Sequence, residues 1–274
     1  MIINHNISAL NTHRQLGVNT GSLAKNVEKL SSGYRINRAA DDAAGLSISE
    51  RMRSQIRGME QATRNSQDGI SLIQTAEGAL QTVNNMLVRI KELATQSANG
   101  TYDTAADRAR IAEEVTELSK EIENINTKTE FNGISLLNAT TDIQLQIGQK
   151  NDQTLTLTAS KFNIDAVTTA VKQYATDIGA QTTAQAILGT IEGHINTVSA
   201  ARSYLGANQN RLENTINNLN ITSENLTAAE SRIRDVDMAK EQMEFTKNNI
   251  LTQASQAMLA QANQLPQGVL QLLR

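Results

Sequence analysis

The sequence predicts a mainly α protein: a long antiparallel helical bundle or coiled coil with a small β-hairpin region, and with its N- and C-terminal helices paired at one end. Three observations predict this fold class. Apolar residues repeat in heptads over long, uninterrupted stretches. Aromatic residues make up only 3% of the chain, and Pro266 is its one proline, so large core-filling side chains and helix breakers are scarce. One short stretch alternates apolar and polar residues, as strands do.

The longest predicted helix runs from Ile187 to about Asp237. Its seam positions follow one another at alternating spacings of four and three residues, which lays one narrow stripe along a helix. The seam consists of Ile191, Ile195, Val198, Arg202, Leu205, Gln209, Leu212, Ile216 and Leu219. About fifty residues of helix are roughly 75 Å long, so this stripe needs equally long partners. The polar members Arg202 and Gln209 are expected to fix its register.

Two further long helices are predicted to supply those partners. The first spans about residues 46–99 and stops at Asn99-Gly100, where glycine suits a left-handed cap. The second spans about residues 104–129 and again carries apolar residues at heptad spacing. Both are expected to pack antiparallel to the long C-terminal helix.

The helical pattern breaks after the turn signal Phe131-Asn132-Gly133. Residues 143–147 and 155–157 alternate apolar and polar side chains, with GQKND between them, which predicts a β-hairpin. The Thr- and Ala-rich residues 160–183 fit neither pattern well enough to assign an element.

Weaker amphipathic patterns occupy the two chain ends, about residues 1–35 and 238–274. The antiparallel order of the long helices brings these ends to the same tip, where they are expected to pair. A buried large apolar side chain gains at most ~1.5–3 kcal/mol, whereas ordering each backbone residue costs ~1–2 kcal/mol. We therefore expect both ends to be largely disordered in a lone subunit and to fold when copies stack.

The composition excludes several classes of function. A net charge of −3 and a pI of about 5.7 give no reason to expect nucleic acid as a partner. No stretch approaches the ~18 consecutive apolar residues of a transmembrane helix, and no secretory leader is encoded. The chain has no cysteine, its three histidines are not spaced as metal ligands, and it lacks G-x-S-x-G and phosphate-loop motifs. No catalytic residue, metal, cofactor or membrane insertion is predicted.

Several segments carry a resemblance to a known family. They are MIINHNISALNTHRQL, LSSGYRINRAADDAAGLSISERMRSQIRGM, NNMLVRIKELATQSANGT, the FNG at 131–133, and AKEQMEFTKNNILTQASQAMLAQANQLPQGVLQLL. In this order they closely resemble bacterial flagellin, over about residues 1–140 and 190–274. The middle of the chain does not carry the resemblance and is too short for a large outer domain.

The resemblance implies a structural, non-enzymatic subunit that polymerises into the bacterial flagellar filament for swimming motility, outside the cell. It further implies export of the unfolded subunit through the flagellar type III machinery, an export chaperone on about residues 235–274, and contact with a filament cap. The alternative is a hook–filament junction protein, which shares the terminal helices.

The resemblance also divides the chain. Residues 1–45 and 238–274 would form the two halves of a filament-core helical domain, with a connector at the end of the first. Residues 46–139 and 184–237 would form a helical mid-domain, and 140–183 a short variable hairpin region.

Three sets of residues carry the site hypotheses. A charged cluster is interpreted as a connector packed between neighbouring subunits, with a solvated face as the alternative: Arg35, Arg38, Asp41, Asp42, Arg51 and Arg53. The polymerisation stripe of the filament core comprises Ile3, Ile7, Leu10, Leu251, Met258, Leu265, Val269 and Leu272. Arg89, Leu93 and Glu114 resemble the flagellin segment recognised by the animal innate receptor Toll-like receptor 5, although by spacing alone they would be an ordinary helix surface.

Overall fold

The computed structural model describes residues 6–101 and 105–272, and the side chains of all of these except 105 and 265–272. The chain forms two compact units. The terminal unit contains Met1–Ile56 and Glu224–Arg274, and the middle unit contains Arg57–Ser223. The boundary between the units falls inside two long helices, α2 (Ala43–Ser97) and α5 (Gln181–Arg234). Because these helices are continuous, residues of both units belong to the same elements.

The mainly α class is confirmed. The predicted helix over 187–237 is α5, which begins six residues earlier, at Gln181, and ends at Arg234. The predictions over 46–99 and 104–129 correspond to α2 and to α3 (Ala105–Lys128). The unassigned stretch 160–183 contains a helix that the sequence analysis missed, α4 (Asp165–Asp177).

The core of the middle unit follows the heptad pattern. In α2, Leu80, Val83, Leu87 and Ile90 are fully buried. The predicted seam of α5 is buried at every seventh residue, at Ile191, Val198, Leu205 and Leu212. Val115 and Ile122 of α3 belong to the same core. Each such side chain contributes ~1.5–3 kcal/mol when fully buried, so this unit holds most of the chain's apolar stabilisation.

The two polar seam positions of α5 differ in their partners. Arg202 reaches α2, where its Nη2 donates to Glu77 Oε1 at 2.8 Å. Gln209 instead donates to Glu213 in its own helix, at 3.0 Å. Of these two seam residues, Arg202 is the one that forms a side-chain hydrogen bond to a neighbouring helix, as a register-fixing residue would.

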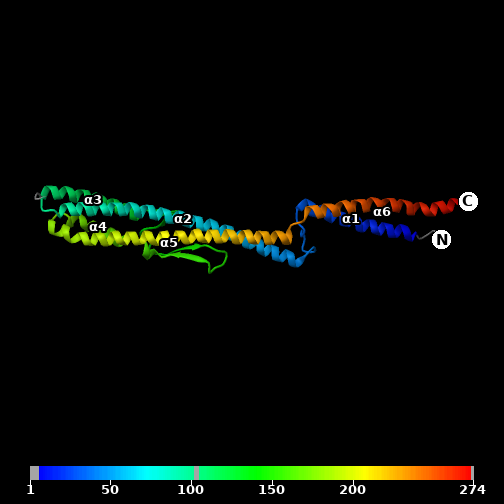
Figure 1. Ribbon diagram of the computed structural model, residues 1–274, viewed down its shortest axis with the longest axis horizontal. Helices are drawn as coiled ribbons and strands as arrows, with labels where there is room; N and C mark the ends of the chain where they lie inside the picture. The colour runs from blue at the N-terminus through cyan, green and yellow to red at the C-terminus, as the bar shows by residue number, and fades with distance from the viewer. Residues whose placement is uncertain (1–5, 102–104, 273–274) are drawn as a thin grey trace. The chain divides into compact units, whose positions relative to one another are not determined.

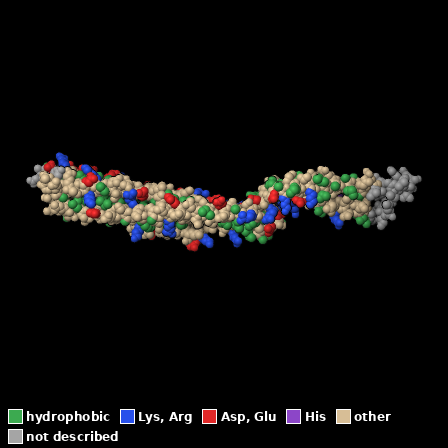
Figure 2. Space-filling view, in the orientation of Figure 1, with side chains coloured by type: hydrophobic (Ala, Val, Ile, Leu, Met, Phe, Trp, Pro, Cys, Tyr) green, Lys and Arg blue, Asp and Glu red, His purple; other side chains and the backbone are tan. Residues whose placement is uncertain are grey.

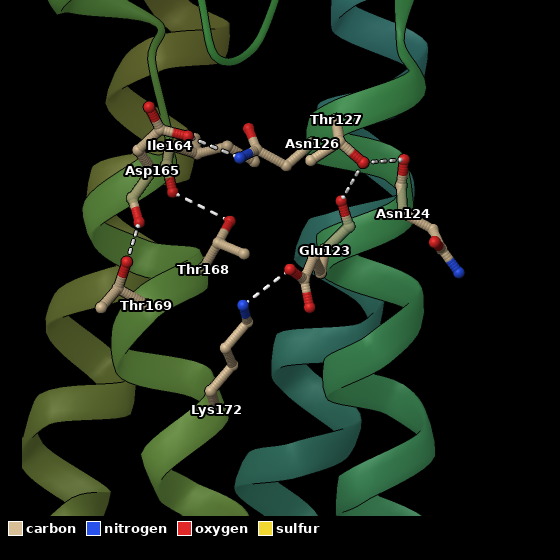
Figure 3. A network of polar contacts seen from close by, with 9 residues as sticks. All are labelled: Glu123, Asn124, Asn126, Thr127, Ile164, Asp165, Thr168, Thr169 and Lys172. Carbon is tan, nitrogen blue, oxygen red and sulfur yellow. Dashed lines mark hydrogen bonds and ion pairs between the residues drawn. The ribbon is translucent and has the colours of Figure 1, made fainter.

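A polar network joins α3 to α4 (Figure 3). The buried Asn126 of α3 donates through Nδ2 to Asp165 Oδ1 at 2.6 Å, in the first turn of α4. Two turns further along α4, Lys172 pairs with Glu123 of α3 at 2.6 Å. These contacts lie at the side of an apolar interface that includes Val171 and Ile122, and they align α4 along α3.

The predicted hairpin is confirmed as β3 (Ile143–Gln146) paired antiparallel with β4 (Thr154–Leu157). Leu155 and Leu157 are buried, because the alternation turns every second side chain toward the helices. A glycine of α2 makes room for the hairpin: a Cβ at Gly69 would lie 2.6 Å from Leu145 Cδ1. Figure 1 shows the hairpin alongside the helices of this unit.

The turn signal at 131–133 forms a second, smaller hairpin. Strand β1 (Glu130–Phe131) pairs with β2 (Ile134–Ser135). Asn132 and Gly133, with φ values of 52° and 77°, occupy the two turn positions between them. Both residue types tolerate this left-handed backbone, as a tight two-residue hairpin turn requires.

In the terminal unit, α1 (Ile7–Ser32) and α6 (Met238–Leu272) lie side by side, which confirms the predicted pairing of the terminal helices (Figure 1). Helix α1 ends at Gly33, whose left-handed backbone (φ 74°) lets its N–H donate to Lys29 O. Asp237 caps α6, accepting from Ala239 N at 3.0 Å. Among the described residues, no helix is both long and apolar enough to cross a membrane.

Candidate assembly surface

The helix pair α1–α6 meets along a seam in which polar and apolar side chains are mixed. The least exposed positions of α6 follow heptad spacing and are Glu241, Phe245, Asn248, Thr252, Ser255, Leu259 and Ala262. On α1, half-buried leucines alternate with buried asparagines, as Leu16, Asn19, Leu23, Asn26 and Leu30. Along α1, contacts to α6 through leucines therefore alternate with contacts through asparagine side chains, which form hydrogen bonds.

Hydrogen bonds across the seam occur near both ends and in the middle. Asn6 Nδ2 donates to Ala262 O at 2.7 Å, and Asn19 Nδ2 donates to Ser255 Oγ at 3.0 Å. The amide of Asn26, with its nitrogen turned toward the acceptors, donates to Glu241 Oε1 at 3.0 Å and accepts from Asn248 Nδ2. Such buried amides favour one register of a helix pair at some cost in stability.

Several large apolar side chains of this pair are exposed and take no part in the seam. On α1, the side chains of Ile7 and Leu10 are 72% and 66% exposed. On α6, Met243, Ile250 and Met258 are each at least 60% exposed. Met243 and Ile250 lie on the side of the helix opposite the seam, whereas Met258, three residues after the seam residue Ser255, flanks the seam. Figure 2 shows hydrophobic side chains across the visible surface of these two helices. Large apolar side chains exposed together in this way are candidates for an interaction surface.

The sequence-predicted polymerisation stripe falls on this outward surface. Ile7, Leu10, Leu251 and Met258 are all exposed. Ile3 lies outside the described residues, as do the side chains of Leu265, Val269 and Leu272. The polar members of the pairing seam were not predicted because Asn, Ser and Thr at heptad positions carry no hydrophobic signal, although their spacing does.

A second cluster surrounds Tyr34, where the segment after α1 meets the start of α2 and the end of α5. The guanidinium carbons of Arg234 and Arg53 lie 4.9 and 5.9 Å from the centre of its ring. Arg53 pairs with Glu230 at 3.0 Å, and Arg234 pairs with Glu50 at 2.6 Å. This arrangement stacks two cations on one aromatic ring and neutralises each with a carboxylate.

The connector residues predicted from the sequence divide into three groups. Arg35 and Arg53 join the Tyr34 cluster; the backbone N–H of Arg35 donates to Arg234 O at 2.7 Å. Arg38 and the two aspartates shape the loop before α2. Arg51 is exposed on α2. Sequence reasoning missed Tyr34 and Arg234, and the concentration of arginines near the only aromatic of the segment was the available signal.

The loop before α2 is held by carboxylates. Asp41 Oδ2 accepts from the backbone N–H groups of Asn37 and Arg38, and these hydrogen bonds hold the pKa of Asp41 below its usual value. Asp42 Oδ1 accepts from Gly45 N at 2.8 Å in the first turn of α2. Arg38 pairs with Glu28 of α1 at 2.9 Å. The loop is thus tied to both helices that it connects.

The residues of the receptor hypothesis lie in the middle unit, where α2 packs on α3. Arg89 Nε donates to Glu114 Oε1 at 2.9 Å, and this hydrogen bond raises the pKa of Arg89. Arg89 also pairs with Glu92 at 3.2 Å. Leu93 is 2% exposed and belongs to the core. The structure therefore brings Arg89 and Glu114 together on the surface and sets Leu93 beneath it.

No arrangement suited to bond-making chemistry emerges in the described part of the chain. Within residues 6–101 and 105–272, no group of three or more metal-ligating side chains converges. His194 lies against Tyr174, with ring centres 6.1 Å apart, and burial lowers the pKa of this histidine and raises that of the tyrosine. This contact packs α4 on α5.

Known proteins resemble the chain over its whole length. It matches the bacterial flagellin N-terminal helical region over residues 3–142 and the bacterial flagellin C-terminal helical region over residues 188–273. A flagellin of Halalkalibacterium halodurans is 58% identical over 275 residues, and the alignment covers 100% of both chains.

Solved structures agree with these matches. The crystal structure of Bacillus cereus flagellin is 33% identical, with a TM-score of 0.50, over 57% of this chain and 88% of that one. A putative flagellar hook-associated protein from Vibrio parahaemolyticus is 15% identical, with a TM-score of 0.62, over 71% of this chain and 100% of that one, and therefore shares the fold alone. The chain belongs to the bacterial flagellin family, whose members are structural subunits of the flagellar filament and not enzymes.

Proposed function

We propose that this subunit polymerises through the outward apolar surface of its terminal helices, and that copies of the chain cover that surface in an extracellular filament. The observation that carries the proposal is the distribution of polar and apolar side chains in the α1–α6 helix pair. Asn19, Asn26 and Ser255 form hydrogen bonds in its inner seam, whereas Ile7, Met243 and Ile250 are exposed on the outside. A pair that hides amides and exposes isoleucines gains apolar burial only when further copies pack on it.

Electron microscopy of purified protein after salt-seeded assembly tests this function. Filaments of uniform width support it. Monomers that stay soluble at every concentration contradict it and favour the hook–filament junction alternative, in which the same helices would meet a different neighbour. A fold shared with a hook-associated protein at 15% identity does not favour that alternative.

The charged connector is proposed to pack between neighbouring subunits. Arg51 supports this role because it is an exposed cation on α2, two residues before Arg53, which is paired with Glu230, and so on nearly the opposite side of the helix. Replacing Arg51 with alanine is expected to weaken polymerisation while leaving the Tyr34 cluster intact. Filaments of normal length from Arg51→Ala would count against this role. The division into a filament-core domain (1–45 and 238–274) and a mid-domain (46–139 and 184–237) belongs to the same proposal.

Export of the unfolded subunit through the flagellar type III machinery is also proposed, with a chaperone over about residues 235–274 and delivery to a filament cap. The exposed side chains of Met243 and Ile250 support a chaperone, because a lone subunit offers this apolar surface to water. Co-purification of a cytosolic partner with the full chain, lost when residues 235–274 are deleted, is expected. Equal recovery of that partner from the truncated chain would refute the chaperone site.

Recognition by Toll-like receptor 5 is proposed to be incidental to assembly. The exposed Arg89–Glu114 pair supports it, since arginine offers a planar fork and an apolar stem to a partner surface. A receptor reporter assay with Arg89→Ala is expected to lose signal. Leu93→Ala would act indirectly, through the packing beneath the pair. A reporter that responds equally to the wild-type chain and to Arg89→Ala would remove this proposal.

A further inference from the structure

The methionines of the described chain differ in exposure between α2 and α6, and Met52 of α2 is half-buried. Met59 is 3% exposed, and Met86 packs against the core of the middle unit. Met238, Met243 and Met258 of α6 are 52%, 67% and 60% exposed. The thioether sulfurs that solvent reaches most easily are therefore gathered on one helix.

Two of these methionines belong to the outward surface itself. Met243 lies two turns before Ile250 on the face of α6 that is turned away from Asn248 and Ser255, which bond to α1, and the exposed Met258 lies at the edge of that face, beside the seam. Met238 is exposed in the first turn of the same helix. An oxygen added to Met243 or Met258 would thus stand where, under the proposed function, a second copy packs.

We propose that Met243 and Met258 form an oxidation-sensitive modification site at which a peroxide blocks polymerisation of the free subunit; the inference rests on the proposed function. The thioether sulfur attacks one peroxide oxygen, the O–O bond breaks, and an S–O bond forms. The sulfur loses two electrons, the peroxide gains them, and the second oxygen leaves as water after a proton shift. The product is methionine sulfoxide, which methionine sulfoxide reductases convert back to the thioether.

The sulfoxide opposes assembly because it replaces an apolar group with a strong hydrogen-bond acceptor. Burying such an acceptor without a donor is unfavourable, and the described helix N–H groups of α6 are already used within the helix. The critical concentration for assembly is expected to rise about tenfold or more for each buried sulfoxide. In filaments the same sulfurs would be covered, so oxidation would act on subunits before they assemble.

Peptide mass mapping after limited treatment of the monomer with hydrogen peroxide tests the site. Met243 and Met258 should gain one oxygen well before Met59, and the treated monomer should fail to extend seeds that the untreated monomer extends. Treatment with methionine sulfoxide reductases A and B should restore extension. Preformed filaments should show slower oxidation at both positions than the monomer.

The double variant Met243→Leu plus Met258→Leu serves as the matched control, because leucine keeps the volume and apolarity but lacks sulfur. This variant should assemble normally and keep assembling after peroxide treatment. If it loses assembly on treatment as the wild-type chain does, or if oxidised wild-type monomer assembles unchanged, the inference is wrong. Failure of the untreated chain to assemble would instead overturn the proposed function, so the two failures are distinguishable.

Discussion

Truncating Ile250 to alanine measures how much the outward surface of α6 contributes to assembly. The side chain is 61% exposed in the subunit, so that fraction of it is free to be covered by a second copy. The change removes three carbons, at ~0.8 kcal/mol each when buried. Scaled by the exposed fraction, the loss is about 1.5 kcal/mol for each subunit added to a filament end. This corresponds to a critical concentration raised roughly tenfold.

The assay is sedimentation of seeded filaments at a series of subunit concentrations. Ile250→Leu, which keeps the carbon count, should stay within about twofold of the wild-type chain. Thermal unfolding of the middle unit should be the same in all three proteins, because Ile250 lies outside its core. A critical concentration unchanged by Ile250→Ala would refute the reasoning.

Three further predictions concern stability and pH. Leu87→Ala should lower the free energy of unfolding of the middle unit by ~2–5 kcal/mol in chemical denaturation, since Leu87 is fully buried; a loss below 1 kcal/mol would contradict its place in the core. Asn19→Ala leaves Ser255 Oγ without its donor and should cost ~1–2 kcal/mol in the α1–α6 pair, seen as faster proteolysis of the chain ends; an unchanged cleavage rate would oppose the polar-seam account. His194 has a folded pKa below its ordinary 6.5, so the unfolded chain binds the extra proton first, and stability should fall as the pH drops below about 6.5; His194→Gln should remove this part of the pH dependence of thermal unfolding.

Sequence periodicity was sufficient for the long helices because their burial is apolar. Ile191, Val198, Leu205 and Leu212 occupy every seventh position and are all buried, so hydrophobic spacing alone indicated the seam. The β-hairpin could be predicted in the same way, since Leu155 and Leu157 alternate with threonines. Helix α4 was missed because only part of it, including Val167 and Val171, is apolar, and because Thr at several positions weakens a helix signal.

In the α1–α6 pair, hydrophobic spacing was not sufficient to predict which partner each face contacts. Hydrophobic spacing indicated a stripe through Leu251 and Met258 but could not tell whether α1 or another copy covers it. The structure assigns Asn248, Thr252 and Ser255 to the intramolecular seam, which leaves that stripe exposed. The Tyr34 cluster depends on residues far apart in the chain, such as Glu50 and Arg234, whose meeting no local pattern reveals.

The central claim is that copies of the chain cover the outward face of α6. Because the chain has no cysteine, Ile250→Cys introduces a unique thiol there, and Lys150→Cys places a control thiol on the exposed turn of the β3–β4 hairpin. The measurement is the rate of maleimide labelling in monomers and in filaments assembled well above the critical concentration. Labelling at position 250 should be fast in monomers and strongly suppressed in filaments, while position 150 reacts in both. Equal labelling of position 250 in monomers and filaments would contradict the account.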